Sequence, residues 1–431
     1  MTPTGAHLDL PLDRASAAAL SGHGLEYRLV DAGSDAFSGY AHAMDRGFVG
    51  PESTPEQLAA HRETMQQRRL VGVYDAGSPF PVGTIACWAT DLTISPGRTL
   101  PAWAVSGVTV AATHRRRGIA RAMVEGELRS AAAAGLPLAG LTVSEATIYG
   151  RFGFGPAVYV TDWTIDTRRA RWIGPLAPGR LQAVGREELR DDLAELHERV
   201  RDRNPGQVPG WPGLWRRTAG LAPGQADGGK VRGVRYLDPA GTTRGVVSYT
   251  VGGGHEDYTQ HTLHVLQLIA DGDEAYAALW RYLLEHDLVT TVKADLLAED
   301  EPLRWMIADQ RGADISQDGH HWLRVLDLPA VLAARRYRAP VTAVLRVVDP
   351  LGFTDGTWRF EADADGSGWA ARSDAEPEVT LPVAALGSIL LGGVRPSTLV
   401  HAGIIAAPPE LAGRLDLAFA PEAPPRLSLW Y

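Results

Sequence analysis

The sequence predicts an α/β (α+β) chain built on mixed sheets, with two similar domains followed by a third. Its 431 residues are enough for about three domains of ordinary size. Short β-branched runs alternate with stretches of helical apolar spacing, which is typical of sheets covered by helices. A weak internal repeat is the third observation, because residues 231–249 share the glycines and apolar alternation of residues 70–88.

The first domain should begin after a flexible extension. Residues 1–24 are rich in Ala, Pro, Ser and Gly, a composition that favours disorder at a chain end. Ser53 or Thr54 is placed to cap a helix N-terminus. The expected elements are a strand, two helices and a hairpin, at residues 25–30, 34–44, 54–69 and 70–88.

A short basic loop then joins a strand to a helix. Residues 105–110 are β-branched, and apolar residues recur with helical spacing after Gly118. A helix N-terminus offers free N–H groups and partial positive charge, and Gly118 allows close backbone approach. Residues 115–120 therefore suit a pyrophosphate, although a solvated basic helix start is the alternative. A strand at 138–144 and a glycine-rich turn at 149–155 follow.

The rest of the chain predicts a second and a third set of elements. The second set contains a helix, a hairpin, a strand and a helix, at residues 187–203, 231–249, 263–270 and 273–285. The loop at 204–215 is rich in Pro, Gly and Trp and could cover a cleft or an interface. The third set contains strands and a helix, at residues 341–348, 356–362, 368–371 and 382–390.

The second copy differs from the first at the position of the basic loop. Asp271-Gly272-Asp273-Glu274 occupies that position, and three carboxylates at a helix start would repel a pyrophosphate. The second copy should therefore be degenerate.

The composition of the chain limits which partners, cellular location and metal sites can be expected. The net charge of −9 argues against nucleic acid as the main partner and fits a cationic substrate. Cys87, the single cysteine, lies in an apolar run and should be a buried thiol. No membrane span or secretory signal is apparent, so we expect a cytoplasmic protein. His261 and His264 have metal-like spacing but lack completing ligands, and the acidic turn at 363–368 lacks the glutamate of a calcium loop, so no metal is expected.

The motif around Gly118 resembles the acetyl-CoA loop of the GNAT acetyltransferases, Gln/Arg-x-x-Gly-x-Gly/Ala. Combined with Ile-Tyr-Gly-Arg-Phe-Gly-Phe-Gly-Pro at 148–156, it looks like the Eis family of actinobacterial aminoglycoside and lysine N-acetyltransferases. The resemblance implies tandem GNAT-type domains followed by a sterol-carrier-like domain. We expect a flexible extension, a cofactor-binding domain, a degenerate copy and the C-terminal domain at residues 1–24, 25–165, 166–315 and 316–431.

The same resemblance implies which residues bind acetyl-CoA. They are Val108, Thr109, Val110, Arg115, Arg116, Arg117, Gly118, Ile119, Ala120, Arg121, Ser144 and Glu145. Tyr149 would be the general acid, since a phenol with a pKa of about 10 keeps its proton at neutral pH. The C-terminal carboxylate of Tyr431 would be the general base. The family commonly ends in Phe, so Tyr431 adds a hydroxyl at this position.

These expectations describe direct acetyl transfer to a primary amine of a cationic substrate, either an aminoglycoside or a polyamine-like molecule. Two alternatives remain open, namely lysine acetylation on proteins or peptides and a non-catalytic CoA- or lipid-binding module. The resemblance also implies a homohexamer. Residues 37–44 and 211–215 are expected to line the substrate pocket.

Overall fold

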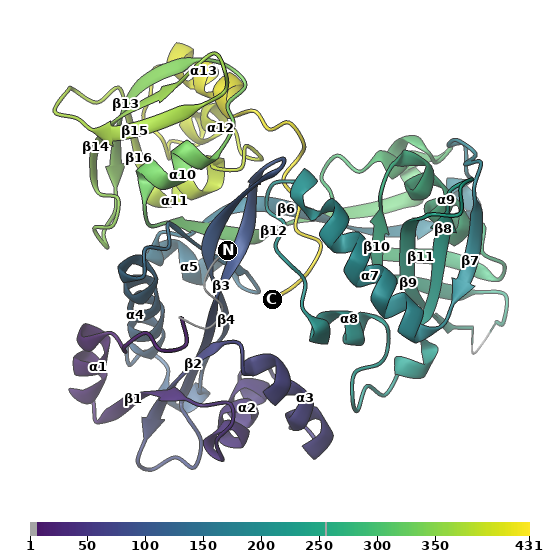
Figure 1. Cartoon of the computed structure of the whole chain (residues 1–431), viewed down its shortest axis with the longest axis horizontal. Coiled ribbons are helices and arrows are strands. Elements are labelled where there is room, and N and C mark those ends of the chain that lie inside the picture. The colour runs from purple at the N-terminus through teal and green to yellow at the C-terminus, as the bar shows by residue number, and fades with distance from the viewer. Residues whose placement is uncertain (1–6, 255–256) are drawn as a thin grey trace. The chain divides into compact units, whose positions relative to one another are not determined.

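The computed structural model describes residues 7–254 and 257–431. The chain forms two compact units. The first contains the chain up to Val158 together with Gly319–Pro425 and Trp430–Tyr431, and the second contains Tyr159–Asp318 and Arg426–Leu429. The colour gradient in Figure 1 follows the chain through both units.

A mixed sheet forms the centre of the first unit. β4 and β5 run parallel, whereas β1 with β2, β2 with β3, β3 with β4 and β5 with β12 pair antiparallel. In spatial order the strands are β1 (Leu25–Val30), β2 (Arg69–Asp75), β3 (Gly83–Ser95), β4 (Arg98–Val110), β5 (Leu138–Thr142) and the end of β12 (Ala313–Val325).

Helices cover both faces of this sheet. Successive side chains of a strand point to opposite faces, so Ile85 and Ala86 of β3 belong to two different apolar clusters. Ile85 packs in the cluster that contains α4 (Ile119–Ala133), and Ala86 packs with α2 (Ala36–Gly47). Helix α3 (Pro55–Met65) lies beside α2 (Figure 1).

Four elements of the first unit differ from the sequence-based expectation. The helix expected to reach residue 69 ends at Met65, because Arg69 lies in β2 and forms a buried ion pair with Glu127 of α4. Strand β3 extends beyond the expected end of the hairpin, and β4 begins earlier than the strand expected after it. Helix α1 (Arg14–Ser21), capped by Asp13, lies within the expected extension, whose first six residues fall outside the described ones.

The second unit has its own set of strands and its own apolar core. The core surrounds Trp163 and Trp280, and the hairpin and helix predicted from the repeat are present. The strands, in spatial order, are β6 (Gly155–Asp166), β11 (Val289–Leu297), β10 (His261–Ala270), β9 (Thr243–Gly253), β8 (Arg232–Leu237) and β7 (Arg180–Val184). The helices include α6 (Thr167–Ala170), α7 (Arg186–Val200), α8 (Pro212–Thr218) and α9 (Asp273–Leu284).

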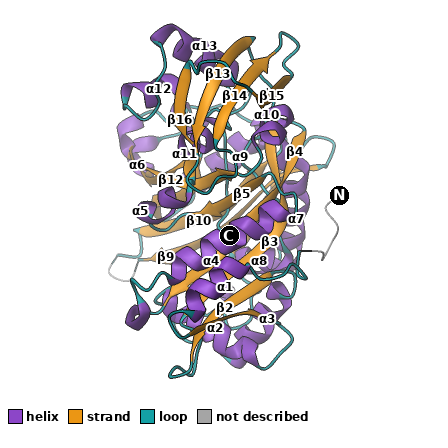
Figure 2. Cartoon of the chain, turned by 90° about the vertical axis from the view of Figure 1, so that its left-hand side faces the viewer, coloured by secondary structure: helices purple, strands orange, loops and turns teal. Residues whose placement is uncertain are grey.

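A separate four-stranded sheet follows β12 (Figure 2). Its order is β15 (Gly368–Arg372), β14 (Gly356–Ala362), β13 (Val341–Val348) and β16 (Val379–Pro382). The accompanying helices are α10 (Leu328–Ala334), α11 (Val383–Ile389), α12 (Pro396–His401) and α13 (Pro409–Phe419). A fully buried ion pair between Arg324 of β12 and Asp349, just after β13, joins this region to the main sheet.

Candidate active site

Strand β4 contains a bulge close to its end. Thr84 of β3 pairs with Thr109 and Ala86 pairs with Ser106, so β4 has one residue more than β3 in this interval. Gly107, in the bulge, has a φ of +60°, a left-handed conformation that glycine adopts without a steric penalty. The bulge therefore redirects the backbone at residues 106–108.

Beyond the bulge, β4 and β5 are no longer paired. Their parallel pairing covers Ala102–Ala104 with Leu138–Gly140 and stops there. β4 continues to Val110 and β5 to Thr142, so the two strands diverge toward their carboxyl ends. Backbone amides of residues 108–110 at such an opening can pair with an extended amide-containing ligand as an added strand would.

The basic loop leads directly into α4. Arg116 has a φ of +63° and Gly118 a φ of +76°, and such alternation turns neighbouring N–H groups toward a common side. A Cβ at Gly118 would have no heavy atom within 4 Å, so the N-terminus of α4 is accessible. This geometry fits a pyrophosphate at a helix N-terminus.

The arginines of the loop have different surroundings. Arg117 lies 3.5 Å from Asp75 and donates to the carbonyl of His23, so it fastens the loop to the sheet. Arg121 lies 3.8 Å from Glu125 on the same helix. Arg115 and Arg116 are exposed and form no ion pair within the described residues, so their guanidinium groups are available to an anion.

The other predicted cofactor residues belong to the ends of β4 and β5. Val108 and Val110 are half-buried, while Thr109 is buried with its hydroxyl 2.6 Å from that of Thr84. Ser144 and Glu145 follow β5 and are exposed, and Ile119 and Ala120 form the first turn of α4.

Tyr149 ends α5 (Ala146–Tyr149), the short helix after β5. Its ring packs edge-to-face on Phe154, with the centroids 6.1 Å apart. Burial, together with the charge of Glu145, raises the pKa of the Tyr149 phenol above its usual value. The phenol therefore holds its proton at neutral pH and can donate it to a departing anion.

The turn after Tyr149 is fixed by a buried arginine. The Nε of Arg324 donates to the carbonyl of Phe152 at 2.7 Å, and its guanidinium is paired with Asp349. Burial alone would raise the pKa of Asp349, but Arg324 and the N–H groups of Thr354 and Leu351 outweigh it and lower that pKa. The carboxylate thus stays charged and keeps Arg324 in place.

The last residue of the chain lies against β5. The hydroxyl of Thr142 donates to a terminal oxygen of Tyr431 at 2.6 Å. The Tyr431 phenol lies 2.6 Å from Nε2 of His321, and its ring packs edge-to-face on Trp88 at 5.5 Å. A Cβ at Gly140 would lie 3.0 Å from the Tyr431 hydroxyl, so this glycine makes room for the terminal side chain.

Sequence reasoning missed Thr142, His321, Gly140 and Trp88. Gly140 offered a signal, since a glycine within an apolar strand often marks the close approach of another group. The adjacent His320 and His321 suggested only an incomplete set of metal ligands, and nothing in the sequence indicated that His321 contacts the end of the chain. The structure brings the terminal residue to β5 and places Ser144, Glu145 and Tyr149 in the segment that follows this strand.

A pocket of about 400 Å³ adjoins the bulge of β4. Its walls come from the end of α2, the loop after it, α3, and Ser106 with Gly107. Of the two stretches expected to line the substrate pocket, the first contributes Met44, whereas Phe37 is buried in the core. In the second stretch Trp215 is buried against His197, with the ring centroids 5.0 Å apart.

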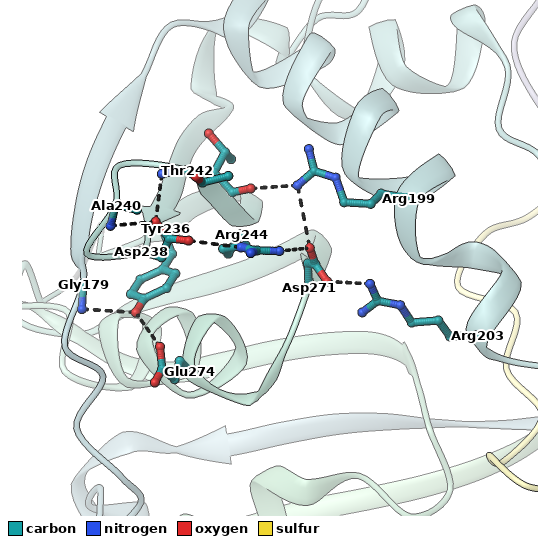
Figure 3. Close-up of polar contacts among 11 residues, drawn as sticks. Gly179, Arg199, Arg203, Tyr236, Asp238, Ala240, Thr242, Arg244, Asp271 and Glu274 are labelled. Atoms are coloured by element: carbon teal, nitrogen blue, oxygen red, sulfur yellow. Dashed lines mark hydrogen bonds and ion pairs between the residues drawn. The ribbon is translucent and has the colours of Figure 1, made fainter.

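In the second unit, the position of the basic loop is taken by a carboxylate that already has partners. Figure 3 shows Asp271 beside Arg199, Arg203 and Arg244, with nitrogen-to-oxygen distances of 3.7, 2.6 and 2.9 Å. Although burial opposes it, pairing with Arg203 and Arg244 lowers the pKa of Asp271. The carboxylate of Asp271 thus stands before α9 and pairs with these guanidinium groups, so they are already engaged and not available to a phosphate.

Among the described residues, no group of three or more His, Cys, Asp or Glu side chains is arranged to bind a metal ion. None of the described helices combines the length and the apolar character needed to cross a bilayer. Cys87 is buried, as expected, and burial raises the pKa of its thiol well above the usual value.

Family models match three successive parts of the chain. An acetyltransferase (GNAT) domain matches residues 27–157, another GNAT model matches 206–325, and a sterol carrier protein domain matches 328–428. These matches confirm the expected fold class of two GNAT domains followed by a sterol-carrier-like domain. GNAT acetyltransferases use acetyl-CoA. The domain boundaries and individual site residues inferred from the sequence stay predictions.

Full-length relatives give the same family. N-acetyltransferase Eis of Mycobacterium bovis is 34% identical over 395 residues, covering 89% of this chain and 94% of the relative. An uncharacterised N-acetyltransferase of Streptomyces avermitilis is 34% identical over 362 residues, covering 82% and 86%. The crystal structure of Eis1 from Mycobacterium abscessus has a TM-score of 0.80 and 28% identity, covering 94% of this chain and all of that one. The chain is an N-acetyltransferase and belongs to the Eis family of GNAT enzymes.

Proposed function

We propose that this protein transfers acetyl from acetyl-CoA directly to a primary amine of a cationic substrate, with Tyr149 as general acid and the Tyr431 carboxylate as general base. The observation that supports the proposal is the contact of the terminal oxygen with Thr142, the last residue of β5, which lies beyond the point where the pairing of β4 with β5 stops. The thioester supplies an activated acetyl group, and the residues of the chain supply binding, orientation and proton transfer.

The cofactor contacts follow from the loop and the strand ends. Residues 115–121 would hold the pyrophosphate through the N–H groups before α4 and through the guanidinium groups of Arg115 and Arg116. The amides of residues 108–110 would pair with the pantetheine and donate to the thioester oxygen as negative charge develops there. Ser144 and Glu145 would complete the contact from β5.

Proton transfer is assigned to the two tyrosines. A terminal carboxylate has a pKa of about 3.5 in water and so is ionised at neutral pH. It attracts an ammonium group and can take a proton from the amine, directly or through water. Tyr149, whose pKa is raised, gives its proton to the departing thiolate.

Free-thiol release tests this proposal. The protein is mixed with acetyl-CoA and a panel containing kanamycin, spermidine, an alkylamine and a lysine-containing peptide. Amine-dependent thiol release with a matching acetylated product is the expected result. Thiol release that no amine accelerates would contradict it. Aminoglycosides and polyamines are the class that the resemblance favours, and peptide lysine is the alternative.

We assign the sterol-carrier-like domain a scaffold role. Its apolar cavity lies between strands β13 and β16 and helices α11, α12 and α13 and measures about 10 Å³. A space of this size holds about one water molecule and is far smaller than a lipid chain. The expected homohexamer and cytoplasmic location are part of the same proposal, and light scattering of the purified protein tests the assembly.

A further inference from the structure

The bulge of β4 is held by side-chain hydroxyl groups. Gly107 and Val108 together oppose the single residue Ile85 of β3, because the pairs on either side of them are one residue out of step. The backbone groups of a bulge cannot all bond to the neighbouring strand, so some of them need other partners. The Thr84 hydroxyl donates to the carbonyl of Gly107, and the Tyr40 hydroxyl donates to the carbonyl of Ile85, both at 2.8 Å.

Thr84 also connects two points of β4 across the bulge. A threonine hydroxyl has one proton, and that of Thr84 goes to Gly107, so the Thr109 hydroxyl donates to Thr84 at 2.6 Å. Both side chains are buried, which keeps water from competing for these bonds. Gly47 of α2 packs directly on Thr109, since a Cβ at Gly47 would overlap the Thr109 side chain. The pair of hydroxyl groups therefore has a fixed geometry.

Tyr40 holds the opposite strand of the bulge from α2. Its side chain is fully buried, and burial raises the pKa of the Tyr40 phenol well above the usual value, so the hydroxyl stays a hydrogen-bond donor. Residues 37–44 were expected to line the substrate pocket, but Tyr40 bonds to the backbone of β3 instead. Two buried hydroxyl groups thus bind the two strands of the bulge.

The carbonyl of Gly107 determines where the N–H of Val108 points. The two groups belong to one planar trans peptide and so point in opposite directions. With the carbonyl bound by Thr84 of β3, the Val108 N–H points away from β3. β4 lies between β3 and β5, and its pairing with β5 ends at Ala104. The Val108 N–H therefore faces the side on which β4 and β5 are no longer paired.

From this arrangement we infer that Thr84 is a positioning residue for acetyl transfer, which acts by directing the Val108 N–H at the thioester oxygen. The inference rests on the proposed reaction. When the amine nitrogen attacks the acetyl carbon, negative charge develops on this oxygen, and the electron pair returns when the carbon–sulfur bond breaks. The amine gives its proton to the Tyr431 carboxylate, and the thiolate takes one from Tyr149. An N–H that is already oriented stabilises the charge without rearranging during the reaction.

Thr84→Val in the full-length protein tests this role. Valine has nearly the same size but cannot bond to Gly107. Thiol release is measured at saturating acetyl-CoA with kanamycin, spermidine, an alkylamine and a lysine-containing peptide. Loss of one donor to a developing oxyanion costs about 10²–10³-fold and a misdirected donor costs less, so we expect kcat to fall about 10- to 100-fold. Affinity for free CoA, which has no acetyl carbonyl, should stay within about twofold.

Two control variants separate positioning from packing. Thr84→Ser keeps the hydroxyl and loses one methyl group, so kcat should stay within about threefold although the thermal midpoint falls. In the second unit the Thr161 hydroxyl donates to the carbonyl of Ala298 and accepts from Nε1 of Trp163, both at 2.9 Å, which matches the bonding of Thr84. Thr161→Val should lower the thermal midpoint about as much as Thr84→Val and leave kcat unchanged.

The vibrational spectrum of the bound thioester reports the N–H contact directly. A hydrogen bond to the thioester oxygen weakens the carbonyl bond and lowers its stretching frequency. With carbonyl-labelled acetyl-CoA bound, we expect the band at a higher frequency in Thr84→Val than in the natural protein. Thr84→Ser and Thr161→Val should show the frequency of the natural protein.

Tyr40→Phe tests the bulge without altering Thr84. The ring stays in the core, and only the hydrogen bond to Ile85 is lost. We expect about a 3- to 10-fold lower kcat, a smaller loss than in Thr84→Val, because the Ile85 carbonyl belongs to a different peptide from the Val108 N–H. The carbonyl band should move in the same direction as in Thr84→Val.

The possible results distinguish this inference from the proposed reaction. An unchanged kcat in Thr84→Val, or an equal loss in Thr84→Ser or Thr161→Val, would overturn the inference and leave the acetyl-transfer proposal intact. A carbonyl band at the same frequency in Thr84→Val and the natural protein would do the same. Thiol release by the natural protein that none of the four amines accelerates would overturn both.

Discussion

Nε2 of His321 and the phenol oxygen of Tyr431 are 2.6 Å apart, in a region where His321 is fully buried. Burial also raises the pKa of the Tyr431 phenol, so the hydroxyl remains a hydrogen-bond donor over the working pH range. This contact joins β12 to the end of the chain. It also gives a structural role to the hydroxyl by which this chain departs from a phenylalanine terminus.

Replacing Tyr431 with Phe should separate the hydroxyl from the carboxylate. The variant keeps the terminal carboxylate and its contact with Thr142 but removes the hydroxyl that contacts Nε2 of His321. We expect a loss of about 1–3 kcal/mol in unfolding free energy, typical of a buried polar group that loses its bond. Turnover should fall less than tenfold. Urea unfolding and steady-state kinetics measure the two effects, and a turnover loss above 100-fold would assign the hydroxyl to catalysis.

Extending the chain beyond Tyr431 should abolish acetylation. Two added residues convert the terminal carboxylate into a peptide bond, which has no basic oxygen at neutral pH. We expect turnover below 1% of that of the unextended protein, with an unchanged circular dichroism spectrum and thermal midpoint within about 3 °C. The same two residues added at the N-terminus are the control. Full activity in the extended protein would remove Tyr431 from the mechanism.

Tyr149→Phe should lower turnover without weakening cofactor binding. The substitution keeps the ring that packs on Phe154 and removes one proton, and general-acid catalysis contributes about 10²–10⁴-fold. Acetyl-CoA affinity, followed by calorimetry, should stay within about twofold. Because burial and the charge of Glu145 raise the pKa of this phenol, the loss of turnover of the natural protein on the alkaline side should begin at a higher pH than for an ordinary phenol. A loss of turnover between pH 7 and 9 that disappears in the variant would contradict the raised pKa.

Arg116→Gly isolates the contribution of one guanidinium group. Glycine accepts the positive φ of this position, so the loop conformation should persist. A charge-assisted hydrogen bond contributes about 1.5–3 kcal/mol, which corresponds to about a 10- to 100-fold rise in KM for acetyl-CoA. Turnover at saturation should not change. Arg171→Gly, at another arginine with positive φ, should leave KM unaltered, and an unchanged KM in Arg116→Gly would exclude the contact.

One acetyl-CoA should bind per chain. In the second unit Asp271 already pairs with Arg203 and Arg244, so neither guanidinium group is available to a pyrophosphate before α9. Calorimetric titration should give a stoichiometry of one, and Asp271→Asn should leave it at one while lowering the thermal midpoint. A stoichiometry of two in the natural protein would show that the second copy also binds cofactor.

Local pattern was sufficient for the part of the site that is continuous in sequence. The strand, basic loop and helix around Gly118 are fixed by short-range alternation and helical spacing, and each is present. The bulge at Gly107 was not predicted, because it depends on how β4 pairs with a strand more than twenty residues earlier. Loop-start residues such as Arg117 were predicted as cofactor ligands, but their local ion pairs were not visible in the sequence.

Contacts between segments that are far apart in the chain could not be predicted from the sequence. The pairing of His321 with Thr142 across β12 and β5 sets where His321 lies, and the apolar pattern of either strand alone does not specify that register. The same holds for Arg324, whose partners Phe152 and Asp349 are 172 and 25 residues away. Residues 314 and 316–318 of β12 are polar and exposed, so this part of the strand gave little periodic signal, and its strand character comes from pairing with its neighbours.

The divergence of β4 from β5 also bears on how long the folded chain survives. The ends of β4 and β5 that face each other have no strand between them, so their backbone N–H and C=O groups on these sides are unpaired. Unpaired strand edges are sites where chains begin to aggregate. A ligand that pairs with those strands protects them and shifts the folding equilibrium by mass action. The supply of acetyl-CoA would then determine the lifetime of this protein as well as its rate of turnover.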